Sequence, residues 1–218
     1  MDSQKKDLSI FMNYRRLKEI KRCNNFPVIS KEDVAQHSFY VALLAMIMAD
    51  QYNEWACSVK IDSPTLEVEF VLVNIEDVLR KALMHDLEES FTSDLPWNIK
   101  HMDEEAHEAI SRIINQRLKA AYANSQAMDK YRCYSSHCKE GFAGAFVRTA
   151  DMLELALYCW EEAAKGNIFL KLMIDKCVSI IKSFGEYQSF IEAIPLFKNL
   201  MDLIESDPSK AAGLLDLD

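Results

Sequence analysis

Glycine and proline are scarce in this sequence, and each occurs only five times among 218 residues. Because turns between short strands rely heavily on these two residue types, an architecture of many strands is disfavoured. Long helices joined by a few loops fit the composition, and half of the residues are hydrophobic, which is enough for one core. The sequence therefore predicts a single all-α domain over residues 1–205 and a flexible C-terminal tail at 206–218.

Positive charge is also in short supply. The chain has 25 basic and 34 acidic side chains, which gives a formal net charge of −9. A net acidic protein repels a polyphosphate backbone, and no run of lysine or arginine would follow a nucleic-acid strand. We therefore expect no nucleic-acid polymer as partner. A small phosphorylated ligand remains possible, because a local basic pocket or a metal can override the average field.

Long apolar runs and secretory features are absent as well. The longest apolar run, Phe39 to Ala49, has eleven residues, whereas a membrane-spanning helix needs roughly 20. The start of the chain, MDSQKKDLSI, is polar and does not resemble a secretory signal. We therefore interpret the six cysteines as reduced thiols and expect a cytoplasmic protein that does not contact membranes.

Hydrophobic periodicity and capping residues divide the chain into helices. A first helix is predicted over 6–22, and a second begins after Ser30, with Asp33 completing a start that resembles a capping box. A loop is predicted over 53–64, and the helix that follows it ends near residue 90. The remaining helices are predicted over 103–123, 141–165, 168–183 and 186–204.

Ionisable residues stand at three places on apolar helical faces, where burial is expected. His37 lies on the stripe of the second helix, His85-Asp86 ends an apolar run, and Asp151 opens another. A buried carboxylate without a partner costs on the order of several kcal/mol or takes up a proton. A divalent cation removes that cost, and neutral imidazoles complete its shell. This mixed nitrogen and oxygen set would suit Mn, Co, Ni, Fe or Zn rather than Ca.

The sequence around these residues resembles a known family. Four segments follow in the family's order: EDVAQHS at 32–38, ALMHDLEE at 82–89, SDLP at 93–96 with Lys100, and TADML at 149–153. They are similar to the E-x-V-x-E-H-S, A-L-x-H-D-x-x-E, G-D-L-P-x-x-x-K and K-x-A-D-x-L segments of the nucleotidase branch of the HD superfamily. From about residue 15 to 170 the chain resembles the bacterial 5′-deoxynucleotidase group.

The resemblance implies an HD-domain helical bundle that commonly forms a homodimer. It also implies a metal-dependent phosphohydrolase that removes phosphate from (deoxy)nucleoside 5′-monophosphates, so the partner would be a small nucleotide. A metal of this kind lowers the pKa of water and polarises a phosphoryl oxygen.

The resemblance also assigns a role to each matched residue. The metal ligands would be His37, His85, Asp86 and Asp151. Glu89 would orient or deprotonate the attacking water, and Asp94 would lie near the substrate and the leaving oxygen. Arg22 would contact the phosphate or the sugar, a task that suits its planar guanidinium, and Lys100 would add a phosphate contact.

Two features depart from the family's pattern. Cys23 stands where the branch usually has a tryptophan directly after the arginine, and the interval between His37 and His85 is longer than usual, especially over 53–76. Both leave the sugar and base selectivity open.

Other functions stay open at this point. A dNTP triphosphohydrolase that releases triphosphate would use the same metal site. A helical binding module with a vestigial site is disfavoured, because the complete ligand set and Glu89 are present. A dinuclear phosphodiesterase would need further histidines, for which His101, His107 and His137 are available. Cys133 and Cys138 with His137 match no standard zinc spacing.

Overall fold

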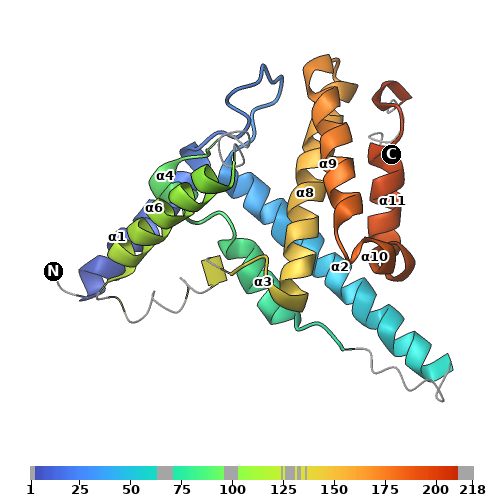
Figure 1. Cartoon of the computed structure of the whole chain (residues 1–218), viewed down its shortest axis with the longest axis horizontal. Coiled ribbons are helices and arrows are strands. Elements are labelled where there is room, and N and C mark those ends of the chain that lie inside the picture. The colour runs from blue at the N-terminus through green and yellow to red at the C-terminus, as the bar shows by residue number, and fades with distance from the viewer. Residues whose placement is uncertain are drawn as a thin grey trace.

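A computed structural model describes residues 3–62, 71–95, 103–123, 125, 131, 134–135 and 137–210. Within these ranges the regular elements are helices, apart from one isolated β-bridge between Lys21 and Asp33. The α-helices are α1 Ser3–Tyr14, α2 Val34–Asp62, α3 Ile75–Met84, α4 Glu89–Thr92, α6 Glu104–Tyr122, α8 Gly141–Ala164, α9 Lys171–Ser183, α10 Tyr187–Ala193 and α11 Pro195–Ile204 (Figure 1). Short 3₁₀ helices are η1 Arg15–Glu19, η2 Ile168–Leu170 and η3 Pro208–Lys210. The helical architecture confirms the predicted fold class.

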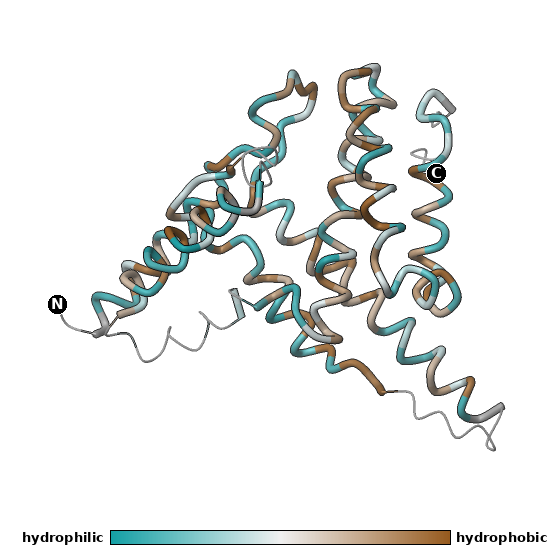
Figure 2. Tube along the Cα trace, viewed as in Figure 1, coloured by the Kyte–Doolittle hydropathy of each residue, from teal (hydrophilic) through white to brown (hydrophobic). Residues whose placement is uncertain are grey.

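The main core forms where α2 crosses α8 and where α3, α9, α10 and α11 pack against these two helices (Figure 1). Phe146 of α8, Phe190 of α10 and Phe197 of α11 are almost completely buried, and Phe190 packs against both Phe146 and Phe197. Figure 2 shows hydrophobic residues recurring along α8, α9 and α10 where these helices pack together. Burial of large aromatic side chains supplies much of the stability of such a core. It also fixes the position of α2 relative to α8, on which the site depends.

A smaller cluster joins α1 to α6 at the other end of the molecule (Figure 1). Ile10 of α1 packs on Leu118 and Tyr122 of α6, and the hydroxyl groups of Tyr14 and Tyr122 are in contact. Phe91 of α4 packs edge-on against Tyr14, with ring centroids 6.5 Å apart. These contacts attach the segment after α3 to the N-terminal helix.

The second helix is longer than its sequence predicts. The prediction of a loop over 53–64 is wrong for residues 53–62, because α2 is 29 residues long and ends only at Asp62. Asn53 explains the continuation, since its side chain accepts a hydrogen bond from the backbone N–H of Val73 (2.8 Å) and donates to the carbonyl of Val73 (3.0 Å). Ala56, one turn further on, is 1% exposed. Tertiary contacts therefore extend the helix past residues with weak helical signals.

Other predicted boundaries are also wrong. The first helix, predicted over 6–22, ends at Tyr14, and the 3₁₀ helix η1 follows it as far as Glu19. The carboxylate of Asp33 accepts from the backbone N–H of Gln36, and the Gln36 side chain accepts from Asp33 in return, so this pair caps α2 in place of Ser30. The helix predicted to end near residue 90 stops at Met84, and a turn separates it from α4. The helix predicted over 186–204 breaks at Ile194, because Pro195 begins α11.

Part of the predicted tail packs on the domain. Pro208 is buried, and η3 contacts α8. Residues 211–218 lie outside the described ranges, so the domain boundary at residue 205 stays a prediction. In the described part of the chain, no helix combines the length and the apolarity needed to cross a membrane.

Candidate metal centre

Three helical segments bring the predicted ligands together. His37 lies in the first turn of α2, Asp151 lies in the middle of α8, and His85-Asp86 directly follows the end of α3. Because α2, α3 and α8 pack on one another in the main core, these segments face a common point. Both histidines are almost fully buried, with exposures of 0% and 2%.

The four ligand atoms converge within a few ångströms. Nε2 of His37 lies 3.2 Å from Nε2 of His85, 3.0 Å from Oδ1 of Asp151 and 3.6 Å from Oδ2 of Asp86. Nε2 of His85 lies 3.2 Å from Oδ2 of Asp86 and 3.7 Å from Oδ1 of Asp151. Ligand atoms about 2.1 Å from one metal ion lie roughly 3.0 Å apart on an octahedral edge and roughly 3.4 Å apart on a tetrahedral edge. The spacing of His37, His85 and Asp151 therefore fits a single divalent metal ion, and Asp86 lies next to His85 as the predicted fourth ligand.

The other ring nitrogen of each histidine also has a polar partner. Nδ1 of His85 donates to the carbonyl of Ala82 at 2.7 Å, and Nδ1 of His37 contacts the carboxylate of Glu154. Since a carbonyl oxygen only accepts, the proton of His85 resides on Nδ1. The Nε2 lone pair of His85 then faces the two aspartates, and this group of acceptors is stable only around a cation or with added protons.

The electrostatics of the cluster agree with this interpretation. Burial opposes protonation of His85, yet the neighbouring carboxylates of Asp86 and Asp151 outweigh it and raise the pKa of this imidazole well above its usual range. A centre that attracts protons this strongly attracts a divalent cation by the same field.

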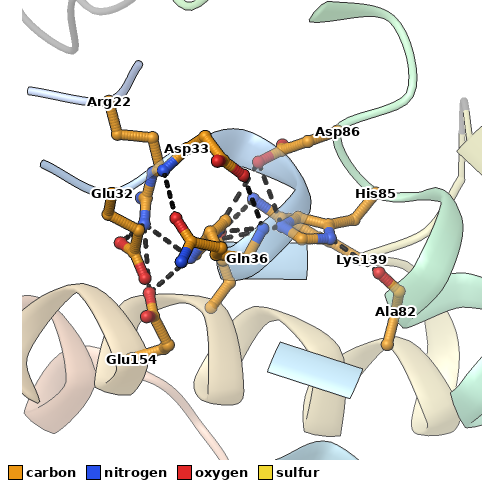
Figure 3. A network of polar contacts seen from close by, with 11 residues as sticks. Arg22, Glu32, Asp33, Gln36, Ala82, His85, Asp86, Lys139 and Glu154 are labelled. Atoms are coloured by element: carbon orange, nitrogen blue, oxygen red, sulfur yellow. Dashed lines mark hydrogen bonds and ion pairs between the residues drawn. The ribbon is translucent and has the colours of Figure 1, made fainter. Parts of the chain in front are cut away.

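On its Nδ1 side, His37 contacts a group of charged residues formed by Arg22, Glu32 and Glu154. Nη1 of Arg22 donates to Glu154 at 3.0 Å and to Glu32 at 3.3 Å, and it lies 2.5 Å from Nδ1 of His37. Figure 3 shows Arg22, Glu32 and Glu154 on one side of the cluster and His85 and Asp86 on the other. The carboxylate of Glu154 thus accepts a bond from the guanidinium and contacts the imidazole. Such a carboxylate–histidine pair orients a metal ligand.

The segment that carries Arg22 and Glu32 is tied to α8. The carboxylate of Glu162 accepts from the backbone N–H groups of Ile29 (2.6 Å) and Ser30 (2.8 Å). The hydroxyl of Tyr158 donates to the carbonyl of Ser30, and the side chain of Asn167 donates to that of Pro27. These bonds connect residues more than 100 positions apart, so they place the loop where local sequence preferences would not.

Lys139 forms an ion pair with Asp151, one of the four predicted ligands. Nζ of Lys139 lies 2.5 Å from Oδ2 of Asp151, while Oδ1 of the same carboxylate faces the two histidines. Burial opposes the charge on Lys139, but Asp151 and Asp86 raise its pKa above the usual range. The lysine is therefore cationic at neutral pH.

Comparison with known proteins places this helical centre in a family. A family described as "5′-deoxynucleotidase YfbR-like" matches residues 9–194 of the chain. The chain belongs to this family. A 5′-deoxynucleotidase of Yersinia pestis (strain Pestoides F) is 30% identical over 205 residues, which cover 90% of this chain and 96% of the relative. The family assignment confirms the resemblance seen in the sequence, and it identifies the protein as a hydrolase.

Solved structures share the fold of this YfbR-like protein. An HD-domain phosphohydrolase of Listeria innocua superposes with a TM-score of 0.69 at 22% identity, over 92% of this chain and 90% of that chain. The HD phosphohydrolase DatZ of cyanophage S-2L, solved bound to dA and one catalytic Zn²⁺ ion, superposes with a TM-score of 0.51 at 16% identity, over 88% of this chain and 95% of that chain. These matches confirm the HD-domain helical bundle.

The other predicted site residues are Glu89, Asp94 and Lys100, and the structure describes the first two of them. Glu89 opens α4 one turn after Asp86, its backbone N–H donates to the carbonyl of Asp86, and it is 3% exposed. Burial raises the pKa of the Cys23 thiol to about 11; the charge of Arg22 opposes this effect and the charge of Asp94 adds to it, so Asp94 lies within electrostatic range of Cys23. Lys100 lies outside the described residues. The roles assigned to these side chains stay predictions.

Residues that the sequence did not single out also line the centre. Glu154 and Lys139 each contact a predicted metal ligand, and Glu32 binds Arg22. A signal for Glu154 was available, since it follows Asp151 by three residues and therefore shares its helical face. Lys139 gave no such signal, because it precedes α8 and reaches Asp151 only through a turn.

Glu32 gives the site an expected pH dependence. Burial, and after it the charge of Glu154, raises the pKa of Glu32 to about 7. Between the unfolded value near 4.5 and this folded value, the folded state holds a proton that the unfolded chain has released. The stabilisation from this proton is complete below the lower value and is lost as the pH rises through about 7.

In the wild type, the unfolding free energy should therefore decrease between pH 5.5 and 8 as Glu32 loses its proton. In Glu32→Gln, which stays neutral, we expect this decrease to be smaller by on the order of 1–3 kcal/mol. Denaturant titrations give the unfolding free energy of wild type and variant at the same pH values, and the difference between them removes the contributions of other titrating groups. Parallel curves for the two proteins would contradict the assigned proton.

Proposed function

We propose that this protein hydrolyses deoxynucleoside 5′-monophosphates to nucleoside and inorganic phosphate at the metal centre. The four ligands would be His37, His85, Asp86 and Asp151. The observation that carries the proposal is that Nε2 of His37 and Nε2 of His85 lie 3.0–3.7 Å from carboxylate oxygens of Asp86 and Asp151, in a chain whose family is named for this reaction. Such a set of two nitrogens and two oxygens suits Mn, Co, Ni, Fe or Zn, and DatZ of cyanophage S-2L, with its Zn²⁺ and dA, supports a metal of this class and a nucleotide substrate.

A divalent metal in this centre supplies Lewis acidity toward the phosphate and lowers the pKa of water. The protein's own residues supply position and proton transfer. Glu89, buried beside Asp86, takes the proton of the attacking water. Asp94, whose charge acts on the thiol of Cys23, would face the leaving oxygen. Arg22 and Lys100 offset the charge of the phosphate.

The support around His37 has a chemical purpose in this scheme. Glu154 keeps the proton of His37 on Nδ1, so Nε2 stays available to the metal. Arg22 holds Glu154 in place and balances its charge. The rigid group lowers the cost of organising the centre when substrate arrives.

Release of triphosphate from dNTPs is the competing reaction. The family match favours the monophosphate reaction, because both the family and its Yersinia relative are named 5′-deoxynucleotidases. The grouping of His37, His85 and Asp151, with Asp86 next to His85 and the buried Glu89 close by, argues against a binding module without activity.

A substrate panel tests the proposal. Metal-loaded protein is incubated with the four deoxynucleoside 5′-monophosphates, their ribonucleotide counterparts and the dNTPs, and products are identified as phosphate or triphosphate. We expect inorganic phosphate from the deoxynucleoside monophosphates and no turnover by Asp86→Ala. Triphosphate released from dNTPs, with monophosphates left intact, would contradict the proposal.

We further propose that the protein acts in the cytoplasm as a homodimer. Apolar side chains on the outer faces of α2 and α1 support self-association, among them Phe39 (59% exposed) and Leu8 (62% exposed). Light scattering after size-exclusion chromatography measures the mass in solution. A mass near the 25.1 kDa of one chain would refute the dimer.

A further inference from the structure

Lys139 lies at the centre without being a ligand. Asp151 uses Oδ1 toward the histidines and Oδ2 toward Nζ of Lys139, at 2.5 Å. One carboxylate thereby places an ammonium group directly beside the position that the metal would take. The lysine side chain is still 45% exposed, so it reaches both the centre and the solvent.

The turn that carries Lys139 is held by several contacts. A Cβ on Gly144 would lie 2.4 Å from the carbonyl carbon of Lys139 and 2.8 Å from its oxygen, so α8 approaches this turn as closely as only glycine allows. Arg148 donates to the carbonyl of Lys139 at 3.1 Å, and Lys81 of α3 donates to that of Glu140 at 2.7 Å. A lysine that merely solubilised the surface would need none of these contacts.

A negatively charged phosphate that approaches the carboxylates of the centre needs a cation that it can reach. In the described part of the chain, the cations in contact with the cluster are Arg22 and Lys139. Arg22 already binds Glu32 and Glu154, and its side chain is only 12% exposed. A phosphate monoester carries close to two negative charges at neutral pH. Lys139 has three N–H donors, of which Asp151 accepts one, and the others remain for an incoming oxygen.

We propose that Lys139 binds a phosphate oxygen of the substrate at the metal centre, and that it does so while anchored to Asp151. The inference deepens the proposed function and rests on it, since it names a residue that recognises the phosphate. Asp151 sets the position of the ammonium, so a substrate phosphate meets a cation whose position is already fixed.

Binding of inorganic phosphate to the metal-loaded protein tests this role. Isothermal titration calorimetry compares wild type, Lys139→Met, Lys139→Arg and the control Lys182→Met. Lys182 is a good match because it also pairs with a carboxylate, Glu205 at 2.8 Å, and its side chain is 43% exposed, but it lies on α9. Metal content and melting temperature are measured on the same preparations.

We expect Lys139→Met to weaken phosphate binding about 10- to 100-fold, as the loss of a charge-assisted hydrogen bond predicts, while bound metal stays stoichiometric. Lys139→Arg should restore part of the affinity, and Lys182→Met should match wild type. For turnover, KM of Lys139→Met should rise more than kcat falls.

Two results would overturn the inference. Unchanged phosphate affinity in Lys139→Met at full metal occupancy would show that the lysine does not meet phosphate. Loss of metal from Lys139→Met, with phosphate affinity restored by excess metal, would show that it only supports Asp151. Failure of the proposed function looks different, because the wild type itself would then bind metal and hydrolyse no monophosphate.

Discussion

Replacing Asp86 with alanine is expected to abolish both the bound transition metal and hydrolysis, and His85→Ala should do the same. Each change removes one of four ligand atoms at the point where α2, α3 and α8 meet. Asp86→Ala would leave two imidazoles and one carboxylate, and His85→Ala would leave one imidazole and two carboxylates, so each variant has only three of the four ligands. We expect metal content to fall from one ion per chain to near zero and turnover to fall to background.

Metal analysis by mass spectrometry after exhaustive dialysis measures the effect. Asp50→Ala is the matched control, because Asp50 is an exposed aspartate on α2 that should leave both quantities unchanged. Melting in the presence of a chelator compares the folding of the metal-free forms, so that loss of metal is separated from loss of structure. Full stoichiometric metal in Asp86→Ala would refute the ligand assignment.

Glu89→Ala is expected to keep the metal and lose most of the hydrolysis. Glu89 is buried at the start of α4, one turn beyond Asp86, and it is not one of the four matched ligands. Proton transfer by a positioned side chain is typically worth about 10²–10⁴ in rate. We therefore expect kcat to fall by roughly that factor, with KM changed much less.

A structural ion pair is the alternative role for Glu89, with Lys81 or Arg22 as its partner. The structure gives both cations other partners, since Lys81 binds Asp77 and the carbonyl of Glu140, and Arg22 binds Glu32 and Glu154. Under the alternative role, the variant would lose stability and keep its rate. Turnover, metal content and melting temperature measured on one preparation separate the two.

The neighbouring glutamate provides the control for this experiment. Glu88 accepts a hydrogen bond from Ser135 at 3.0 Å and is less buried than Glu89. Glu88→Ala should change stability slightly and leave kcat close to that of the wild type. Near-normal turnover of Glu89→Ala at full metal occupancy would rule out its role in proton transfer.

The sequence by itself determined the helical class and the chemistry of the centre. Scarce glycine and proline with helical periodicity pointed to helices, which the structure confirms. His37, His85, Asp86 and Asp151 could be found because each is an ionisable residue on an apolar face, inside a segment that resembles a family motif.

Only the tertiary structure decided how these parts are supported. Asn53 extends α2 by binding Val73, twenty residues away, and Glu154 meets Arg22 across 132 residues. Lys139 reaches Asp151 because Gly144 lets α8 approach its turn. Contacts of this kind depend on how α2 packs against α8, and periodicity within one helix carries no information about which distant residue its polar groups will meet. The physical reason is that burial removes water as a partner, so each buried polar group must bind whatever the packed fold brings to it.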